Sequence, residues 1–339
     1  MTIAHNTHGL ASPDRRRLCL SSAMWGLVSV PLLLPRQARA QSYPQRPIKL
    51  VVPFPPGGAN DIVARVLAPP LAAALGQPLV IDNRGGAAGT IGTDHVAKSA
   101  PDGLTLLMTP VPFVITQSLY PKLPYDGRRD LVPVALLTSS PFVLAVSSKH
   151  PARNLAELLA MAKKKPDAVS FSSPGSGSPA HLAGQLLKTQ AGVEMMHVPY
   201  KGGGPAVSDM LAGQVDFTMA TPAEIMSHVR GGAARALAVT TANRTPLAPG
   251  VPTVSESGIP GYELSVWYGI TAPRGTPSAV IARLEQEFTT AVQAPQVRER
   301  LIALGMEITP MGANDFGAFL AKELQKWSEL VRTSGATAD

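Results

Sequence analysis

The amino-acid sequence predicts an α/β fold in two domains, each with a mostly parallel sheet flanked by helices. Apolar runs of strand length alternate with glycine- or proline-marked turns and with amphipathic segments, which is the pattern of strand–helix units. The first run, Ile48–Phe54, is apolar except for Lys49 near its start, as expected of a strand buried on both faces. The chain has 339 residues and exceeds the length at which one hydrophobic core stops growing, so two domains are the default.

The first 40 residues have the three parts of a secretory signal peptide. A basic run, Arg15–Arg17, precedes an apolar stretch from Leu18 to Leu34, and Ala38–Ala40 forms a small-x-small cleavage site. Export to the periplasm with cleavage near Ala40 is therefore expected. The segment Asp14–Leu18 also approximates a twin-arginine signal. Serines and a proline interrupt the apolar stretch, which argues against a membrane span.

Composition excludes several classes of function once this leader is set aside. The whole chain has a net charge of +7, but the leader carries five Arg and one Asp, which leaves 25 basic and 22 acidic residues. A net charge of +3 does not predict binding to nucleic acid. The single cysteine, Cys19, lies in the leader, so no disulfide or cysteine nucleophile is expected after cleavage. No spacing of His, Asp and Glu predicts a metal site, and no carboxylate pair indicates a catalytic acid and base.

The predicted elements follow one another as strand, turn and helix. Near the start, Asn60 or Asp61 caps a helix, and Pro69-Pro70 inside that helix is expected to break or kink it. In the middle, Asn154 caps a helix with an apolar stripe that begins at Leu155. Strands are predicted over 79–81, 104–108, 142–147, 169–171, 194–198, 215–219 and 234–240, and further helices over 93–99, 179–190 and 314–331 and from Pro205, Pro222 and Pro277.

Two extended apolar segments, Pro141–Val146 and Leu264–Ala272, are the best candidates for crossovers between domains. Such a pair of crossovers makes the middle of the chain one domain and joins its two ends in the other. The predicted boundaries are therefore residues 41–141 plus 265–339 for lobe 1, and residues 142–264 for lobe 2.

Three predicted helix starts share a proline at the first helical position after a strand, namely Ser178-Pro179, Gly204-Pro205 and Thr221-Pro222. Thr221 and Glu224 also have the spacing of a capping box. Helix N-termini present free N–H groups and a partial positive charge, and in parallel sheets they gather where ligands bind. Every helix needs a cap, so only the repetition of this design indicates an anion-binding function.

Two loops that follow predicted strands indicate a site for a small anion. Residues 172–178 combine glycines, which permit tight turns, with hydroxyls that can donate to a carboxylate. Residues 53–61 follow the most apolar strand; Gly57 and Gly58 expose amides there, and Phe54 can wall a pocket. Two such loops facing each other across a cleft form a clamp for a small anion, although a flexible surface loop is the alternative for residues 172–178.

Other interpretations of the second loop stay open. Gly175-x-Gly177-x-x-Ala180 fits a dinucleotide fingerprint, but the motif alone is weak and a cofactor enzyme is unusual among exported proteins. His181 follows the loop within the next helix, where it either donates to a ligand or only caps and packs. His197, at a strand end, fits a structural role better than a ligand contact.

A series of short motifs runs through the mature chain in order, and several of them are distinctive together. These motifs are Tyr43-Pro44-x-Arg46-Pro47-Ile48, the run from Val51 to Arg65, Leu75-Gly76-Gln77, Asp82-Asn83-Arg84, Pro101-Asp102-Gly103, Leu123–Asp126, Ser176–Leu182, His197–Gly202, Arg235–Thr240, Val251–Glu256 and Ala272–Pro277. With these motifs, the mature chain resembles the Bug family, the TctC-like extracytoplasmic solute receptors of tripartite tricarboxylate transporters.

The resemblance implies a two-lobed periplasmic binding protein, type II-like, with two crossover segments, which closes over a carboxylated small molecule. In that family, backbone amides, hydroxyls and ordered waters hold the ligand carboxylate. Matching positions imply these ligand-binding residues: Phe54, Pro56, Gly57, Gly58, Asp61, Ser173, Gly175, Ser176, Gly177, Ser178, His181 and Thr221. The sequence departs from the family pattern at Pro69-Pro70, Asp82 and Leu104, and none of these positions lies in the predicted clamp.

The leading hypothesis is a non-enzymatic, monomeric receptor with no cofactor that delivers a carboxylate to the membrane permease subunits of a transporter. In the second hypothesis, the same receptor is a ligand sensor whose signalling partner is a membrane sensor kinase. The third is a secreted dinucleotide-dependent enzyme built on Gly175 and Gly177. The distal part of the ligand is expected to contact a mostly apolar pocket, which is lined by Thr109, Pro110, Val111 and Phe113.

Overall fold

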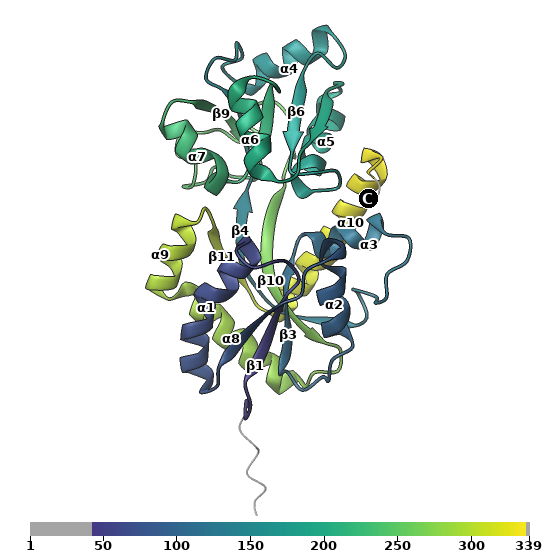
Figure 1. The fold of residues 1–339 in the computed structure, drawn as a ribbon, viewed down its shortest axis with the longest axis vertical. Helices are drawn as coiled ribbons and strands as arrows, with labels where there is room; N and C mark the ends of the chain where they lie inside the picture. The colour runs from purple at the N-terminus through teal and green to yellow at the C-terminus, as the bar shows by residue number, and fades with distance from the viewer. Residues whose placement is uncertain (1–42, 337–339) are drawn as a thin grey trace, which may run out of the picture. The chain divides into compact units, whose positions relative to one another are not determined.

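The computed structural model describes residues 43–336. The predicted signal peptide and its cleavage site near Ala40 lie outside that range. The described residues form two β-sheets with helices on both faces of each (Figure 1), so the α/β prediction is confirmed. None of their helices has the length and apolar character needed to cross a membrane.

The larger sheet has six strands in the order β11-β4-β10-β3-β1-β2. β1 pairs in parallel with β2 and β3, whereas β10 runs antiparallel to β3 and β4, and β11 runs antiparallel to β4. The strands are β1 (Ile48–Val52), β2 (Leu79–Asn83), β3 (Thr105–Pro110), β4 (Leu131–Pro141), β10 (Ser265–Pro273) and β11 (Glu307–Met311).

Helices cover both faces of this sheet because its central strands are apolar on both sides. On β1, Leu50 and Val52 pack toward the core formed with α1, α8 and α9, while Val51 packs toward the core formed with α2, α3 and α10. The helices are α1 (Ala59–Leu75), α2 (Thr90–Ala97), α3 (Pro112–Leu119), α8 (Ser278–Gln293), α9 (Pro295–Ala303) and α10 (Ala313–Ser334), with a 3-10 turn, η1 (Ala87–Gly89), before α2.

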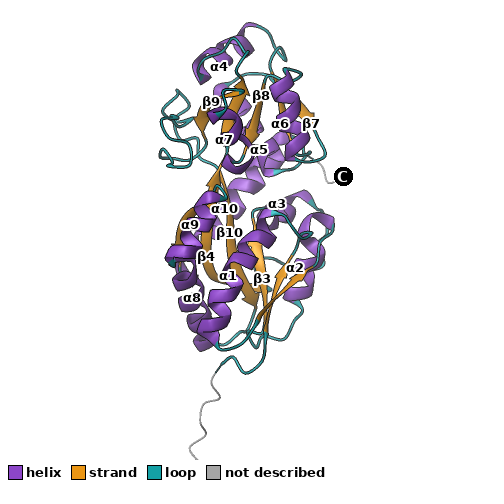
Figure 2. Ribbon diagram, turned by 60° about the vertical axis from the view of Figure 1, so that its left-hand side comes forward, coloured by secondary structure: helices purple, strands orange, loops and turns teal. Residues whose placement is uncertain are grey.

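The smaller sheet has five strands in the order β7-β6-β8-β5-β9, and the strands are drawn in orange in Figure 2. Val143 on β5 packs toward α6 and α7, and its neighbour Leu144 packs toward α4 and α5. The elements are β5 (Val143–Ser147), α4 (Leu155–Lys164), β6 (Ser170–Ser173), α5 (Pro179–Ala191), β7 (Met196–Pro199), α6 (Gly203–Ala212), β8 (Phe217–Ala220), α7 (Pro222–Arg230) and β9 (Ala234–Val239).

Both sheets are mixed rather than mostly parallel. The strand–helix–strand units do pair in parallel, as expected, in β1–β2 and in β6–β7. The exceptions are the strands next to the passages between sheets: β4 leads into β5 with only Phe142 between them, and β5 and β10 both run antiparallel to their neighbours. Two parallel strands need a crossover segment, usually a helix, that returns the chain to the same end of the sheet. A strand that arrives directly from another sheet has no such crossover and can run antiparallel to its neighbours. The apolar pattern of a strand does not reveal its direction.

The two passages between the sheets are tied together at one buried residue. The Thr240 hydroxyl donates to the Leu264 carbonyl at 2.6 Å and accepts from the Phe142 amide at 2.8 Å. All strands of the six-stranded sheet lie before Phe142 or after Leu264, and all strands of the five-stranded sheet lie between them. The lobe boundaries at 141/142 and 264/265 stay a proposal, and Thr240 joins the two segments where they would meet.

Helix α1 corrects two expectations from the sequence. It runs from Ala59 to Leu75 without interruption, although Pro69 and Pro70 lie inside it. Leu67 and Leu71, fully buried on either side of the prolines, anchor the helix to the sheet, while Pro69 is exposed and Pro70 is half-buried. The N-cap residue is Gly58, so neither Asn60 nor Asp61 takes that position.

Helix α6 and several short elements also differ from expectation. Because α6 begins at Gly203, Pro205 is its third residue rather than its first. At α4, by contrast, Asn154 accepts from the Glu157 amide as predicted, and the stripe from Leu155 is buried. Nothing in the sequence pattern predicted α3, α9, β11 or β4 before its last residue, Pro141, and β10 was expected only as a crossover.

Candidate ligand-binding site

The first candidate loop, residues 53–58, connects the end of β1 to the start of α1. Gly57 has a φ of +85°, which favours glycine, and Gly58 is an extended N-cap without a side chain. No side chain caps α1, so the amides of its first turn, which have no intrahelical partners, stay open toward the loop. Phe54 is half-buried and lies against Gly89, while Pro56, Gly57 and Gly58 are exposed.

Asp61 holds this loop in place from inside the helix. Its Oδ2 atom accepts from the Gly57 amide at 2.9 Å and from Arg65 Nε at 2.8 Å, and its Oδ1 atom accepts from Asn83 Nδ2 at 3.0 Å. Asn83 Nδ2 also donates to the Phe54 carbonyl at 3.1 Å. The hydrogen bond from Arg65 is the main cause that lowers the pKa of Asp61 to about 2, against the effect of burial.

This network changes the role predicted for Asp61. The carboxylate is only 2% exposed, carries a negative charge and already accepts from three donors, so it is poorly suited to bind a second carboxylate. It is a positioning residue for the loop. Arg65 and Asn83 belong to the same network, but the sequence analysis gave them no role. A polar residue at the last position of β2 was the only local signal for Asn83.

The second candidate loop, residues 174–178, connects β6 to α5 and is shaped by its own hydrogen bonds. The Ser173 hydroxyl donates to the Gly175 carbonyl at 3.0 Å, and the Ser178 hydroxyl accepts from the His181 amide at 3.2 Å as the N-cap of α5. Gly175 and Gly177 have φ angles of +149° and +71°, which favour glycine. Pro179 takes the first helical position, as predicted.

His181 and His197 form a buried stack beneath this loop. Their ring centroids lie 3.8 Å apart, and Phe171 continues the stack beyond His197. His181 Nδ1 accepts from the Gly177 amide at 3.1 Å, and His197 Nε2 lies 2.7 Å from the Ser173 hydroxyl. Burial lowers the pKa of each histidine to about 4, so both rings are neutral at pH 7.

The hydrogen bonds define which groups of the second loop are free for a ligand. The Gly177 amide, the Ser173 hydroxyl and the Ser178 hydroxyl all have partners within the protein. Ser176 is exposed, and its hydroxyl makes no hydrogen bond to the described residues. His181 therefore positions the loop, and Ser176 is the predicted residue best placed to donate to a ligand.

Thr221, the third helix start predicted to bind an anion, already holds a carboxylate of the protein. Its amide and hydroxyl both donate to Glu224 Oε2, at 2.9 Å and 2.8 Å. The predicted capping box is therefore present at the start of α7. Pro222, the residue after Thr221, occupies the first helical position of α7, as predicted.

The residues expected to line a distal pocket, Thr109, Pro110, Val111 and Phe113, are buried. The Thr109 hydroxyl pairs with Thr271 at 2.8 Å, and Phe113 lines a cavity of about 880 Å³ along α10. Neither candidate loop lines this cavity, whose walls also include Leu131, Leu320 and Leu324. Among described contacts, the second loop approaches Leu119 of α3, since a Cβ at Gly177 would come within 3.2 Å of that side chain.

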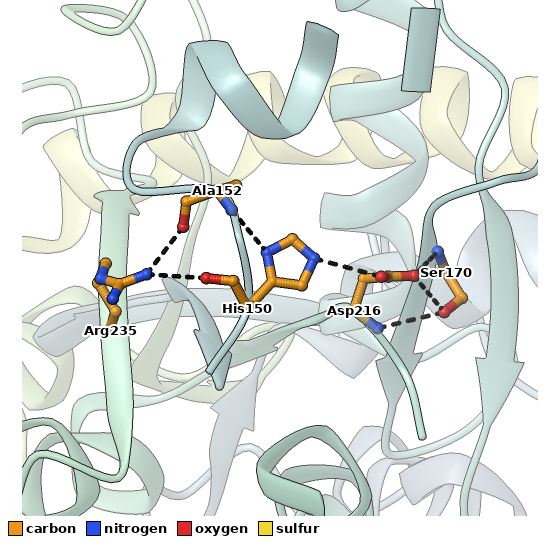
Figure 3. Close-up of polar contacts among 5 residues, drawn as sticks. All are labelled: His150, Ala152, Ser170, Asp216 and Arg235. Carbon is orange, nitrogen blue, oxygen red and sulfur yellow. Dashed lines mark hydrogen bonds and ion pairs between the residues drawn. The ribbon is translucent and has the colours of Figure 1, made fainter. Parts of the chain in front are cut away.

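A polar cluster at the opposite end of β6 contains the residue types of a hydrolase triad without its geometry. The Asp216 carboxylate accepts from the Ser170 amide at 2.7 Å and hydroxyl at 2.8 Å, and lies 3.2 Å from His150 Nε2 (Figure 3). Arg235 donates to the carbonyls of His150 and Ala152. The serine donates to the aspartate rather than to the histidine, so no nucleophile–base contact exists and the cluster ties strand ends together.

Comparison with known proteins identifies the family of this chain. The model of the tripartite tricarboxylate transporter family receptor, TctC, matches residues 63–336. The chain belongs to this family. Members of the TctC family are solute-binding receptors, so the resemblance stated from the sequence motifs is confirmed, and so is the two-lobed fold of a periplasmic binding protein.

Three relatives illustrate the likeness. Protein BugT from Bordetella pertussis is 41% identical over 299 residues, which are 88% of this chain and 92% of BugT. The structure of R. palustris Rpa4515 with adipate has 34% identity and a TM-score of 0.75, and covers 87% of this chain and 99% of its own. The periplasmic binding protein BugD has 35% identity and a TM-score of 0.72, over 87% of this chain and 99% of BugD.

Proposed function

We propose that this protein is a periplasmic receptor that captures a small organic carboxylate between its two lobes and presents it to the permease subunits of a tripartite transporter. The lobes of this proposal are residues 41–141 plus 265–339 and residues 142–264. Family membership supports the receptor role, and the adipate in the Rpa4515 structure supports the ligand class. The protein works as a monomer, without a cofactor and without catalysis.

The pre-formed state of both loops carries the proposal. Each loop follows a buried strand and precedes a helix N-terminus, and each is fixed by a side chain from the first turn of that helix, Asp61 in one case and His181 in the other. The first loop leaves the amides of the α1 first turn open, and the second leaves the Ser176 hydroxyl free. N–H groups and hydroxyls at helix N-termini favour an anion.

Closure supplies the rest of the site. A carboxylate held by both loops favours the conformation in which the loops approach, because it binds that conformation more tightly. The passages joined at Thr240 are the segments that bend. A hydrogen bond to a charged group contributes about 1.5–3 kcal/mol, so a few such bonds give a useful affinity after the cost of ordering.

The first experiment is a thermal-shift screen of residues 41–339, after unfolding and refolding to remove any ligand from the expression host. The panel contains mono-, di-, tri- and aromatic carboxylates, with nicotinamide cofactors as controls. A ligand that binds only the folded state raises the melting temperature, so we expect a rise with one class of carboxylate. A rise with a nicotinamide cofactor alone, or with no compound, would contradict the proposal.

A further inference from the structure

Glu224 is an exposed carboxylate in the first turn of α7, and the sequence analysis considered it only as part of a helix cap. Both hydrogen bonds from Thr221 go to one oxygen of this carboxylate, Oε2. The other oxygen, Oε1, accepts no hydrogen bond from the described residues. Half of the carboxylate is therefore used in capping, and the other half is available.

The free oxygen faces the start of α6. A Cβ atom at Gly203, the first residue of α6, would meet Glu224 Oε1, so this oxygen lies directly against the backbone at the start of α6. Gly202, the N-cap residue, has no side chain that could cap α6. The carboxylate thus lies between two helix N-termini, where the helix dipoles favour a negative charge.

This carboxylate is a near neighbour of the second candidate loop. The Tyr200 amide donates to the Ser173 carbonyl at 2.9 Å, and the Gly202 amide donates to the Pro174 carbonyl at 3.1 Å. The segment that leads into Gly203 is therefore bonded directly to the start of the loop. Glu224 is thus linked to the start of this loop through Gly203 and Gly202.

On its other side, the turn that carries Glu224 contacts lobe 1. A Cβ atom at Gly305, just before β11, would come within 2.8 Å of the Ala223 nitrogen in the first turn of α7. In the same direction, burial and, second, the negative charge of Glu224 raise the pKa of Tyr268 on β10. Glu224 therefore lies near lobe 1 as well as near the segment that is bonded to the second loop.

We infer that Glu224 determines ligand specificity, because its free Oε1 atom accepts a hydrogen bond from the distal end of the carboxylate ligand. The inference rests on the proposed function. The expected ligand has a carboxylate at one end and a hydrogen-bond donor, best an ammonium group, at the other. A second carboxylate at that end would face the charge of Glu224 without a proton between them, and like charges brought together without solvent repel strongly.

The test compares acids of equal length that differ only at the distal end. Calorimetric titration measures adipate against 6-aminohexanoate, and glutarate against 5-aminopentanoate, on refolded wild type and on Glu224→Gln. Glutamine keeps a capping oxygen but presents an NH₂ group in place of a charged oxygen. Glu157→Gln is the matched control, because Glu157 occupies the same N3 position at α4 and accepts from the Arg153 amide and from Asn154.

We expect wild type and Glu157→Gln to bind the amino acids at least about tenfold more tightly than the dicarboxylates, and Glu224→Gln to lose that preference. Equal or tighter binding of dicarboxylates by wild type, or an unchanged preference in Glu224→Gln, overturns the inference and leaves the proposed receptor intact. If neither the dicarboxylates nor the amino acids bind, the result contradicts both this inference and the proposed receptor function. If Glu224→Gln does not fold, Glu224→Asp replaces it in the test. Aspartate keeps the negative charge, but its side chain is one methylene shorter, so this variant should bind the amino acids more weakly than wild type.

Discussion

Asp61 accepts a hydrogen bond from the amide of Gly57, four residues earlier, so a buried side chain in the first helix fixes the loop that precedes it. The equivalent relation in the five-stranded lobe joins His181 to the amide of Gly177, again four residues earlier. Both loops are therefore ordered by the helices they lead into. Pre-ordered loops lose little conformational entropy when a ligand binds, which increases affinity.

Replacing Asp61 with alanine should weaken both ligand binding and the fold. The change leaves the Gly57 amide without its side-chain acceptor and leaves Asn83 Nδ2 with only the Phe54 carbonyl, and a hydrogen bond to a charged group contributes about 1.5–3 kcal/mol. We expect a loss of that size in the free energy of unfolding, measured with urea, and a Kd raised about tenfold or more. The control is Glu194→Ala, which removes the ion pair between this exposed carboxylate and Lys188 and should change neither quantity appreciably. Normal affinity in Asp61→Ala would exclude a positioning role.

Replacing Ser176 with alanine should weaken binding without changing stability. The Ser176 side chain is exposed and bonds to no described residue, so its loss leaves no unsatisfied partner in the free protein. A hydrogen bond to a charged ligand contributes about 1.5–3 kcal/mol, so the Kd should rise about tenfold or more at constant melting temperature. Ser118→Ala, at another exposed serine, should bind normally. Unchanged calorimetric affinity in Ser176→Ala would remove this residue from the site.

The histidine stack should make the fold sensitive to acid. Histidine titrates near 6.5 in the unfolded chain, whereas burial lowers the pKa of His181 and His197 to about 4. The unfolded state therefore binds more protons between these values, and stability is complete above pH 6.5 and falls as the pH drops toward 4. We expect a loss of about 1–3 kcal/mol per histidine in urea unfolding between pH 7 and pH 4.

A variant at His181 separates this effect from general acid denaturation. His181→Asn does not titrate in this range, and its side-chain oxygen can still accept from the Gly177 amide. The loss of stability between pH 6.5 and 4 should be smaller in His181→Asn than in wild type. An identical pH profile would show that His181 is not responsible.

Thr240 should matter for both stability and motion between the lobes. Thr240→Val keeps the shape of the side chain but removes the hydrogen bonds that join Phe142 to Leu264, which leaves buried backbone groups unpaired. We expect a loss of about 1–3 kcal/mol in the free energy of unfolding. Thr333→Val, on the exposed face of α10, is the control and should lose little. A stable Thr240→Val variant with wild-type affinity would argue against a joint at this position.

The sequence predicted those parts of the fold that depend on local chemistry. The apolar run at Ile48 marks a central strand, Asn154 marks a helix start, and Pro179 marks the start of a helix after a loop. Strand direction depends on which strands meet, so the antiparallel pairing of β10 was not predictable from its pattern. The prolines of α1 were misread because packing of Leu67 and Leu71 on the sheet outweighs their local effect.

The candidate site, like the fold, could be predicted from the sequence only in part. Glycines and hydroxyls identified both loops, but the partners that fix them are distant in sequence, as with Asn83 and the Phe54 carbonyl. Sequence motifs suggest Asp61 and His181 as ligand contacts, and this stays a prediction. In the structure both side chains accept hydrogen bonds, from the amides of Gly57 and Gly177, and no sequence motif reveals such an occupied acceptor.

The most direct test of the proposed function is a crystal structure of the refolded protein with the tightest-binding acid from the thermal-shift screen. We predict that the ligand lies between the 53–58 and 174–178 loops, with a carboxylate oxygen within hydrogen-bond distance of the Ser176 hydroxyl. An acid bound instead in the cavity along α10, with both loops unoccupied, would contradict the proposed site.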